Sequence, residues 1–194
     1  MRIGIFGGTF DPPHLGHLIA AQDARTALGL DRIRFVPAHR SPLKAEDSGT
    51  TPEDRFELVC AATFGDEQFE VSRDELDRPA PSYTVDSLAA WTRAEPGIQF
   101  TLLIGLDQWA SFDQWREPEQ IGRMAHIGVL KRGEGDARQV APNLDVAWTE
   151  VPVTRIDISS TQVREYLREG RSVRYLVPEA VRSLIEAKGL YSTC

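Results

Sequence analysis

The chain has 194 residues, 41% of them hydrophobic and 26% charged, which predicts one soluble domain over residues 1–194 with a sizeable core. Its net charge of -7 argues against a general nucleic-acid-binding protein, because such proteins usually carry a basic surface. Two cysteines make no disulfide framework, and neither a signal peptide nor a long apolar run is evident, so a cytoplasmic protein without a membrane span is expected.

The N-terminal segment predicts a phosphate-binding loop. An apolar strand over residues 2–6 leads into Gly7 and Gly8, a polar turn with two prolines follows, and a helix is predicted over residues 15–28. The backbone can approach a ligand closely at the glycines, and the first-turn N–H groups have no partner within the helix. A strand, a glycine-rich turn and a helix N-terminus in this order therefore favour an anionic ligand.

Two histidines mark the start of this first helix. His14 and His17 are three positions apart, so they project from one face of the first turn. Two imidazoles beside a positive helix end suggest an anion that gains charge during a reaction. The alternatives are an ordinary capped helix start and a zinc pair, although no further zinc ligands are evident, since the cysteines are only Cys60 and Cys194.

The rest of the chain alternates strands and helices. Further strands are predicted at residues 32–36, 69–72, 99–104, 126–130 and 147–151. Helices are predicted from the N-cap Thr51, from Ser82–Thr84 through Trp91, as short helices within 107–123, and at 160–169 and 178–188. The helix after Thr51 carries the apolar residues Phe56, Leu58, Val59, Ala62 and Phe64.

This alternation predicts an α/β fold, a Rossmann-like doubly wound and mostly parallel sheet with helices on both faces. The C-terminal helices, about residues 160–194, are a candidate subdomain. In such sheets ligands bind beyond the carboxyl ends of the strands, where the strand order reverses. The polar turns that follow the first four strands are therefore the expected site.

The second chemical signal is a hydroxyl-rich helix start near residue 160. Ser159 and Gln162 fit a capping box, which accounts for those two residues alone. Arg164 lies one turn into the helix, and helical side chains lean toward the N-terminus, so its guanidinium can return to the helix end. Together with the hydroxyls of Ser160 and Thr161, it would form a clamp for a triphosphate.

The string G-G-T-F-D-P-P-H-L-G-H at residues 7–17 resembles the nucleotidyltransferase superfamily, whose mark is H-x-G-H. I-S-S-T-x-x-R at residues 158–164 resembles the second signature of that superfamily. P-S-Y-T-V-D-S-L at residues 81–88, and I-G-L-D at residues 104–107 with Trp115, resemble bacterial nicotinate mononucleotide adenylyltransferases. The first turn lacks both the G-x-G-x-x-G pattern of dehydrogenases and the P-loop pattern.

This resemblance implies transfer of the adenylyl group of ATP to nicotinate mononucleotide, with Mg²⁺ held by phosphate oxygens and water rather than by protein ligands. The implied catalytic residues are His14, His17 and Arg164. The implied ATP-binding residues are Gly7, Gly8, Thr9, Phe10, His14, His17, Gly105, Asp107, Ser160, Thr161 and Arg164. The implied acceptor-binding residues are Lys44, Tyr83, Thr84 and Trp115.

The chemistry of the implied acceptor residues suits a nicotinate ring and its carboxylate. A helix start at Tyr83 and Thr84 offers donors to the nicotinate carboxylate, and a flat Trp115 suits a cationic pyridinium ring. Without the resemblance, a half-buried core tryptophan is the favoured interpretation of Trp115, and a solvated loop charge is the alternative for Lys44. Two departures from the family pattern are Leu106 in place of alanine and Lys131-Arg132-Gly133 without a following proline, which leaves the role of Arg132 open.

Other functions remain open at this stage. Nicotinamide mononucleotide and phosphopantetheine are alternative acceptors, and a non-catalytic nucleotide-binding regulator is a different class. An oxidoreductase on the same kind of sheet is disfavoured because the G-x-G-x-x-G pattern is missing. The sequence does not choose between a monomer and a homo-oligomer.

Overall fold

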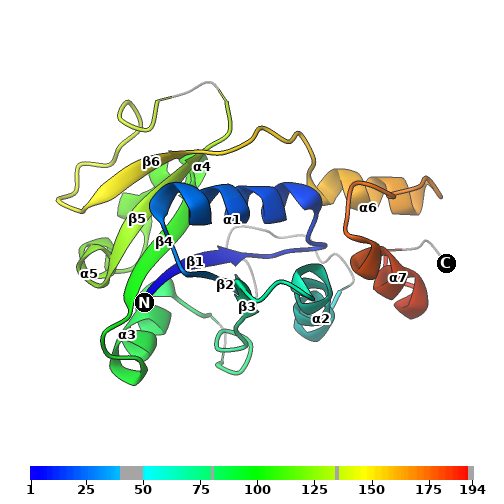
Figure 1. The fold of residues 1–194 in the computed structure, drawn as a ribbon, viewed down its shortest axis with the longest axis horizontal. Helices are drawn as coiled ribbons and strands as arrows, with labels where there is room; N and C mark the ends of the chain where they lie inside the picture. The colour runs from blue at the N-terminus through cyan, green and yellow to red at the C-terminus, as the bar shows by residue number, and fades with distance from the viewer. Residues whose placement is uncertain (40–49, 80, 134–135, 192–194) are drawn as a thin grey trace.

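The computed structural model describes residues 1–39, 50–79, 81–133 and 136–191, and its strands form one six-stranded sheet. The strands are β1 (Arg2–Gly8), β2 (Arg32–Pro37), β3 (Phe69–Val71), β4 (Gln99–Gly105), β5 (Ala125–Lys131) and β6 (Trp148–Pro152). They lie in the order β3-β2-β1-β4-β5-β6, and every neighbouring pair is parallel (Figure 1). The predicted Rossmann-like α/β fold is confirmed.

The strand order reverses at β1, which pairs with β2 on one side and β4 on the other. Ile5 of β1 lies opposite Arg34 of β2 and Leu102 of β4. Figure 1 shows that β1 runs toward the end of the molecule occupied by α6 (Ser160–Arg168) and α7 (Glu179–Lys188). The carboxyl ends of β1 and β4 therefore face the elements that carry the second motif.

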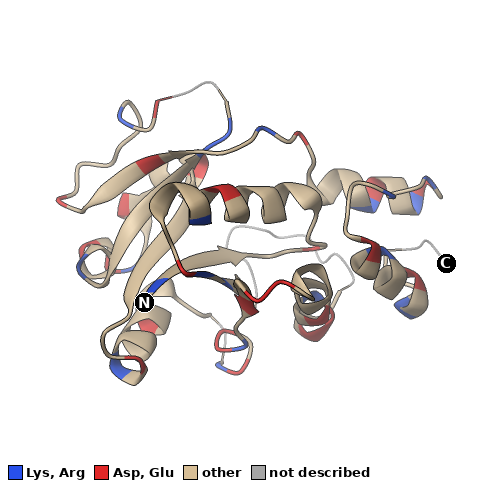
Figure 2. Cartoon of the chain, in the orientation of Figure 1, with Lys and Arg blue, Asp and Glu red and all other residues tan. Residues whose placement is uncertain are grey.

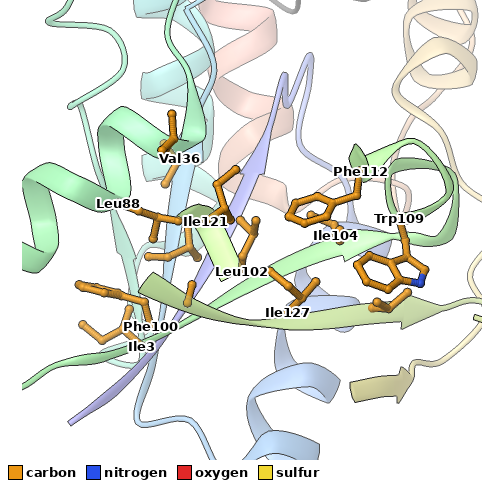
Figure 3. Close-up of a cluster of buried hydrophobic side chains, with 14 of the residues drawn as sticks. Ile3, Val36, Leu88, Phe100, Leu102, Ile104, Trp109, Phe112, Ile121 and Ile127 are labelled. Atoms are coloured by element: carbon orange, nitrogen blue, oxygen red, sulfur yellow. The ribbon is translucent and has the colours of Figure 1, made fainter. Parts of the chain in front are cut away.

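Helices cover both faces of the sheet. One face is covered by α1 (Leu15–Leu28) and α2 (Pro52–Thr63), and the other by α3 (Thr84–Ala94), α4 (Leu106–Ala110) and α5 (Pro118–Met124), with the short 3-10 helix η1 (Phe112–Gln114). Because side chains alternate along a strand, Ile3 and Ile5 join the core under α3–α5, whereas Phe6 joins the core under α1 and α2. Figure 3 shows the first of these cores.

A third apolar cluster ties the C-terminal helices to α2. Leu58 of α2 packs with Val163 of α6 and Ile185 of α7, and all three are almost fully buried. The Lys188 ammonium at the end of α7 lies 2.9 Å from a carboxylate oxygen of Asp54 in α2. Figure 2 shows acidic and basic positions on both of these helices. These contacts hold α6 and α7 beside the carboxyl ends of the strands.

Local sequence signals explain most element boundaries. The Thr51 side chain accepts from the Asp54 N–H at 3.1 Å, so the predicted start of α2 is confirmed. The end of α2 differs from the expectation, because the helix stops at Thr63 and Phe64 is 89% exposed. Gly65 has φ 87°, a conformation that favours glycine, so the chain leaves the helix before Phe64 can reach the core.

No helix in the described part of the chain is both long and apolar enough to cross a membrane.

Candidate active site

Gly7 and Gly8, which the sequence placed in the turn before α1, are the last two residues of β1. They differ in what surrounds them. A Cβ at Gly7 would meet open space, whereas one at Gly8 would lie 2.9 Å from the Phe10 ring. Phe10 is 2% exposed and has φ 49°, which directs its ring into the core below the loop. Phe10 can therefore offer a ligand only its backbone, while Thr9 beside it is half-buried.

His14 and His17 lie together at the start of α1, as predicted. Their rings are stacked, with centroids 3.7 Å apart and an interplanar angle of 27°. The His14 N–H donates to Nδ1 of His17 at 3.2 Å, which caps the helix. Because Nδ1 of His17 accepts this bond, the hydrogen-bond pattern places the ring proton of His17 on Nε2.

His14 is a neutral, buried imidazole at pH 7. Burial, aided by the positive charge of Arg132, lowers the pKa of His14 to about 4. Its Nδ1 is buried and has no hydrogen-bond partner among the described residues, a condition that normally costs free energy. A Cβ on Gly16 would lie 3.1 Å from this Nδ1, so the glycine of H-x-G-H leaves room for the ring.

The second motif meets the first through side-chain hydrogen bonds to backbone. The Ser160 hydroxyl donates to the Pro12 carbonyl at 2.8 Å, and Nη1 of Arg164 donates to the Asp11 carbonyl at 2.7 Å. Nη2 of Arg164 lies 3.4 Å from the Thr161 hydroxyl, and its Nε is buried without a hydrogen-bond partner among the described residues. Ser160 and Arg164, which the sequence assigned to phosphate, thus hold the first-motif loop.

The loop is also held through the buried side chain of Asp11, a role that the sequence analysis missed. Oδ1 of Asp11 accepts from the Thr50 hydroxyl at 2.6 Å and from the Tyr191 hydroxyl at 2.7 Å. Nη1 of Arg164 lies 3.9 Å from Oδ2. Asp11, Thr50, Arg164 and Tyr191 are called the Asp11 cluster below.

A second buried arginine, Arg55 of α2, was also missed. Its guanidinium donates to the carbonyl oxygens of Thr9 at 3.0 Å, Ala38 at 2.6 Å and His39 at 2.8 Å. Arg55 therefore fastens the loop after β1 to the segment after β2. The sequence pattern could have indicated its burial, because Arg55 lies on the same side of the helix as the buried Leu58 and Val59.

One donor at the start of α1 is already used by the protein. The Leu15 N–H, at the first position of the helix, donates to the Leu176 carbonyl at 2.9 Å. Leu176 lies in the connection between α6 and α7. The C-terminal segment thus caps part of the helix end that the sequence analysis left open for an anion.

The turn after β4 is stabilised by its own side chains. Oε1 of Gln108 accepts from the Gly105 N–H at 3.2 Å, and a Cβ at Gly105 would lie 2.7 Å from a carboxylate oxygen of Asp107. Asp107 is exposed in the first turn of α4. Leu106, the departure from the family alanine, packs against the apolar core under α3–α5.

The predicted acceptor residues lie on that same core. Tyr83 is the N-cap of α3, and Tyr83 and Trp115 are both half-buried against the cluster, as Thr84 is half-buried beside them. The Arg116 guanidinium, which the sequence analysis did not single out, lies 4.7 Å from the centroid of the Tyr83 ring and 3.8 Å from an Asp86 carboxylate oxygen. Lys44 lies outside the described residues.

No group of three His, Cys, Asp or Glu side chains converges to hold a metal ion among the residues that the structure describes. The residues at the end of β1 and at the start of α6 are instead hydroxyls, imidazoles and guanidinium groups. Such groups can donate hydrogen bonds to phosphate oxygens.

Comparison with known proteins places this arrangement in a family. The model of the cytidylyltransferase-like family matches residues 5–166. The chain belongs to the cytidylyltransferase-like family. Within it, the chain is 46% identical over 191 residues to a probable nicotinate-nucleotide adenylyltransferase of Thermus thermophilus, covering 98% of this chain and 100% of that protein.

Two further comparisons agree with this assignment. A probable nicotinate-nucleotide adenylyltransferase of Roseiflexus castenholzii is 41% identical over 196 residues, with 98% of each chain covered. The solved structure of Plasmodium falciparum nicotinic acid mononucleotide adenylyltransferase complexed with NaAD matches with a TM-score of 0.78 at 17% identity, covering 98% of this chain and 97% of that one. At that identity the match establishes the fold.

Proposed function

We propose that the protein transfers the adenylyl group of ATP to nicotinate mononucleotide, giving nicotinate adenine dinucleotide and pyrophosphate. The observation that carries the proposal is the meeting of two motifs 148 positions apart, where Ser160 binds the Pro12 carbonyl beside the stacked histidines. The names of the Thermus and Roseiflexus relatives, together with coverage of nearly the whole chain, support the choice of reaction.

In this proposal the histidines and arginines receive the triphosphate. His17 donates from Nε2 to an oxygen of the α-phosphate, where negative charge grows in the transition state. The neutral His14, the Thr161 hydroxyl and the N–H groups of Arg164 that the Asp11 carbonyl does not use hold the leaving phosphates. Ser160 contributes its backbone N–H at the start of α6, because its hydroxyl already donates to the Pro12 carbonyl. The open surface at Gly7 and the turn at Gly105 and Asp107 border the nucleotide.

The chemical step is a single in-line displacement. A phosphate oxygen of nicotinate mononucleotide forms a bond to the α-phosphorus of ATP, the bond from that phosphorus to the bridging oxygen breaks, and pyrophosphate leaves with the electron pair. The attacking phosphate is already ionised, so no side chain has to remove a proton. The protein's contribution is positioning and electrostatic stabilisation.

Mg²⁺ would neutralise charge on the triphosphate and the leaving pyrophosphate when bound. The donors near the two motifs fit a metal that is held by phosphate oxygens and water. Residues of the two motifs would bind the phosphate oxygens that the metal leaves free. ATP and nicotinate mononucleotide are the small-molecule partners.

On the acceptor side, the start of α3 at Tyr83 and Thr84 receives the nicotinate carboxylate, and Trp115 stacks on the pyridine ring. Lys44 is assigned to the acceptor by the resemblance of its loop alone. The half-buried positions of Tyr83 and Trp115 on one core support this assignment, since a ring that is half-covered keeps one face for a ligand.

An isotope experiment tests the reaction type. The protein is incubated with nicotinate mononucleotide and ATP labelled at the α-phosphate or at the γ-phosphate. The proposal predicts that the α-label appears in the dinucleotide and the γ-label in pyrophosphate. A γ-label in the acceptor, or an α-label that stays in AMP, would contradict it.

A further inference from the structure

The Asp11 cluster joins the candidate site to the C-terminal end of the described chain. Tyr191 and Asp11 are 180 positions apart, yet the hydroxyl of Tyr191 lies 2.7 Å from Oδ1 of Asp11. Tyr191 is 8% exposed and Asp11 is 5% exposed, so neither group can exchange this bond freely for water. Asp11 lies in the loop that leads directly into His14.

The backbone at Tyr191 is held in an uncommon conformation. Its φ is 64°, in the left-handed region that a bulky residue rarely adopts. Gly189 ends α7 with φ 64° as well, and the Leu190 N–H donates to the Ile185 carbonyl at 3.0 Å. A conformation of this kind persists only where surrounding contacts enforce it, and such residues cluster at functional sites.

The direction of the hydrogen bond is fixed by chemistry. Burial and the neighbouring carboxylate of Asp11 raise the pKa of the Tyr191 phenol, so the hydroxyl keeps its proton and donates. The Arg164 guanidinium lies on the other side of the same carboxylate and binds the Asp11 carbonyl. One loop residue is therefore held from α6 and from the end of α7 together.

We propose that Tyr191 is a positioning residue, whose hydrogen bond to Asp11 holds the first-motif loop so that His14 and His17 meet the triphosphate correctly. This inference rests on the proposed adenylyl transfer only for its kinetic consequence. The mechanical part, that Tyr191 restrains residues 9–17, stands on the contacts alone.

The test compares Tyr191→Phe with wild type and with Tyr175→Phe. Tyr175→Phe removes the same atom from a tyrosine that is 76% exposed, so it is the matched control. Two quantities are measured at a temperature where each variant is fully folded: hydrogen–deuterium exchange of residues 9–17, and the kcat and KM for each substrate.

In Tyr191→Phe, kcat is expected to fall about tenfold, because a hydrogen bond to a buried charged group is worth a factor of that order. The KM for nicotinate mononucleotide should stay within about twofold, because the proposed acceptor residues lie on elements that Tyr191 does not contact. Exchange of residues 9–17 should accelerate, and Tyr175→Phe should match wild type. In a chain that already carries Asp11→Asn, Tyr191→Phe should lower kcat less than it does in wild type, because the charged acceptor of its hydrogen bond is gone.

A lower melting temperature with unchanged kcat and unchanged exchange of residues 9–17 would make Tyr191 a merely structural residue and overturn the inference. If Tyr191→Phe does not fold, Thr50→Val removes the other hydroxyl donor to the same oxygen and must give the same signature. If wild type releases no pyrophosphate, the proposed function fails, and the exchange measurement alone still decides the role of Tyr191.

Discussion

Replacing Arg55 by glutamine is expected to destabilise the protein strongly. Arg55 is 5% exposed and donates three hydrogen bonds to the carbonyls of Thr9, Ala38 and His39. Each hydrogen bond to a charged group contributes about 1.5–3 kcal/mol, and a glutamine can keep at most one, so the free energy of unfolding should fall by about 3–6 kcal/mol. For a chain of this size that lowers the melting temperature by at least about 6 °C.

The control is Arg73→Gln, which removes an exposed guanidinium that also makes short hydrogen bonds. Arg73 binds both carboxylate oxygens of Glu53 at 2.8 and 2.9 Å, and its side chain is 42% exposed. Exposed pairs contribute at most about 1 kcal/mol. Urea unfolding of both variants measures the difference. Equal losses in the two variants would refute the argument that burial and backbone carbonyls make Arg55 special.

Three further predictions concern the two histidines and Trp115. His17→Ala should lower kcat by about 10²–10³, as for one lost transition-state donor, and a tenfold or smaller drop in steady-state assays would remove His17 from the catalytic residues. Trp115→Ala should weaken nicotinate mononucleotide binding far more than ATP binding by calorimetry; equal effects would make Trp115 a core residue. Because the pKa of His14 is lowered from 6.5 to about 4, the unfolded state takes up a proton first as pH falls. The free energy of unfolding, measured with urea, should therefore drop by about 2 kcal/mol between pH 7.5 and pH 5. His14→Gln should not show this drop. The same pH dependence in the variant would mean that another group titrates.

The features that the sequence predicted well depend on local spacing. His14 and His17 had to share a helical face once the helix began after the two prolines, and the Thr51 cap followed from residues three positions apart. The parallel sheet followed from alternating strands and helices, and with it the position of the polar turns at the carboxyl ends of the strands.

The features that the sequence did not predict depend on tertiary contacts. The partners of Asp11 come from residues 50, 164 and 191, which only the folded chain brings together. Ser160 and Arg164 were assigned to phosphate, and the structure gives both a backbone carbonyl of the first motif as partner. Phe64 was grouped with the apolar residues of α2, but the helix ends one residue before it.

The most direct test of the proposed function is pyrophosphate release from Mg-ATP with each acceptor supplied separately. The acceptors are nicotinate mononucleotide, nicotinamide mononucleotide and phosphopantetheine. The proposal predicts rapid release with nicotinate mononucleotide and much slower release with the other two. Equal rates with both mononucleotides would contradict the role of Tyr83 and Thr84 in reading the carboxylate, and release with phosphopantetheine alone would contradict the proposed acceptor.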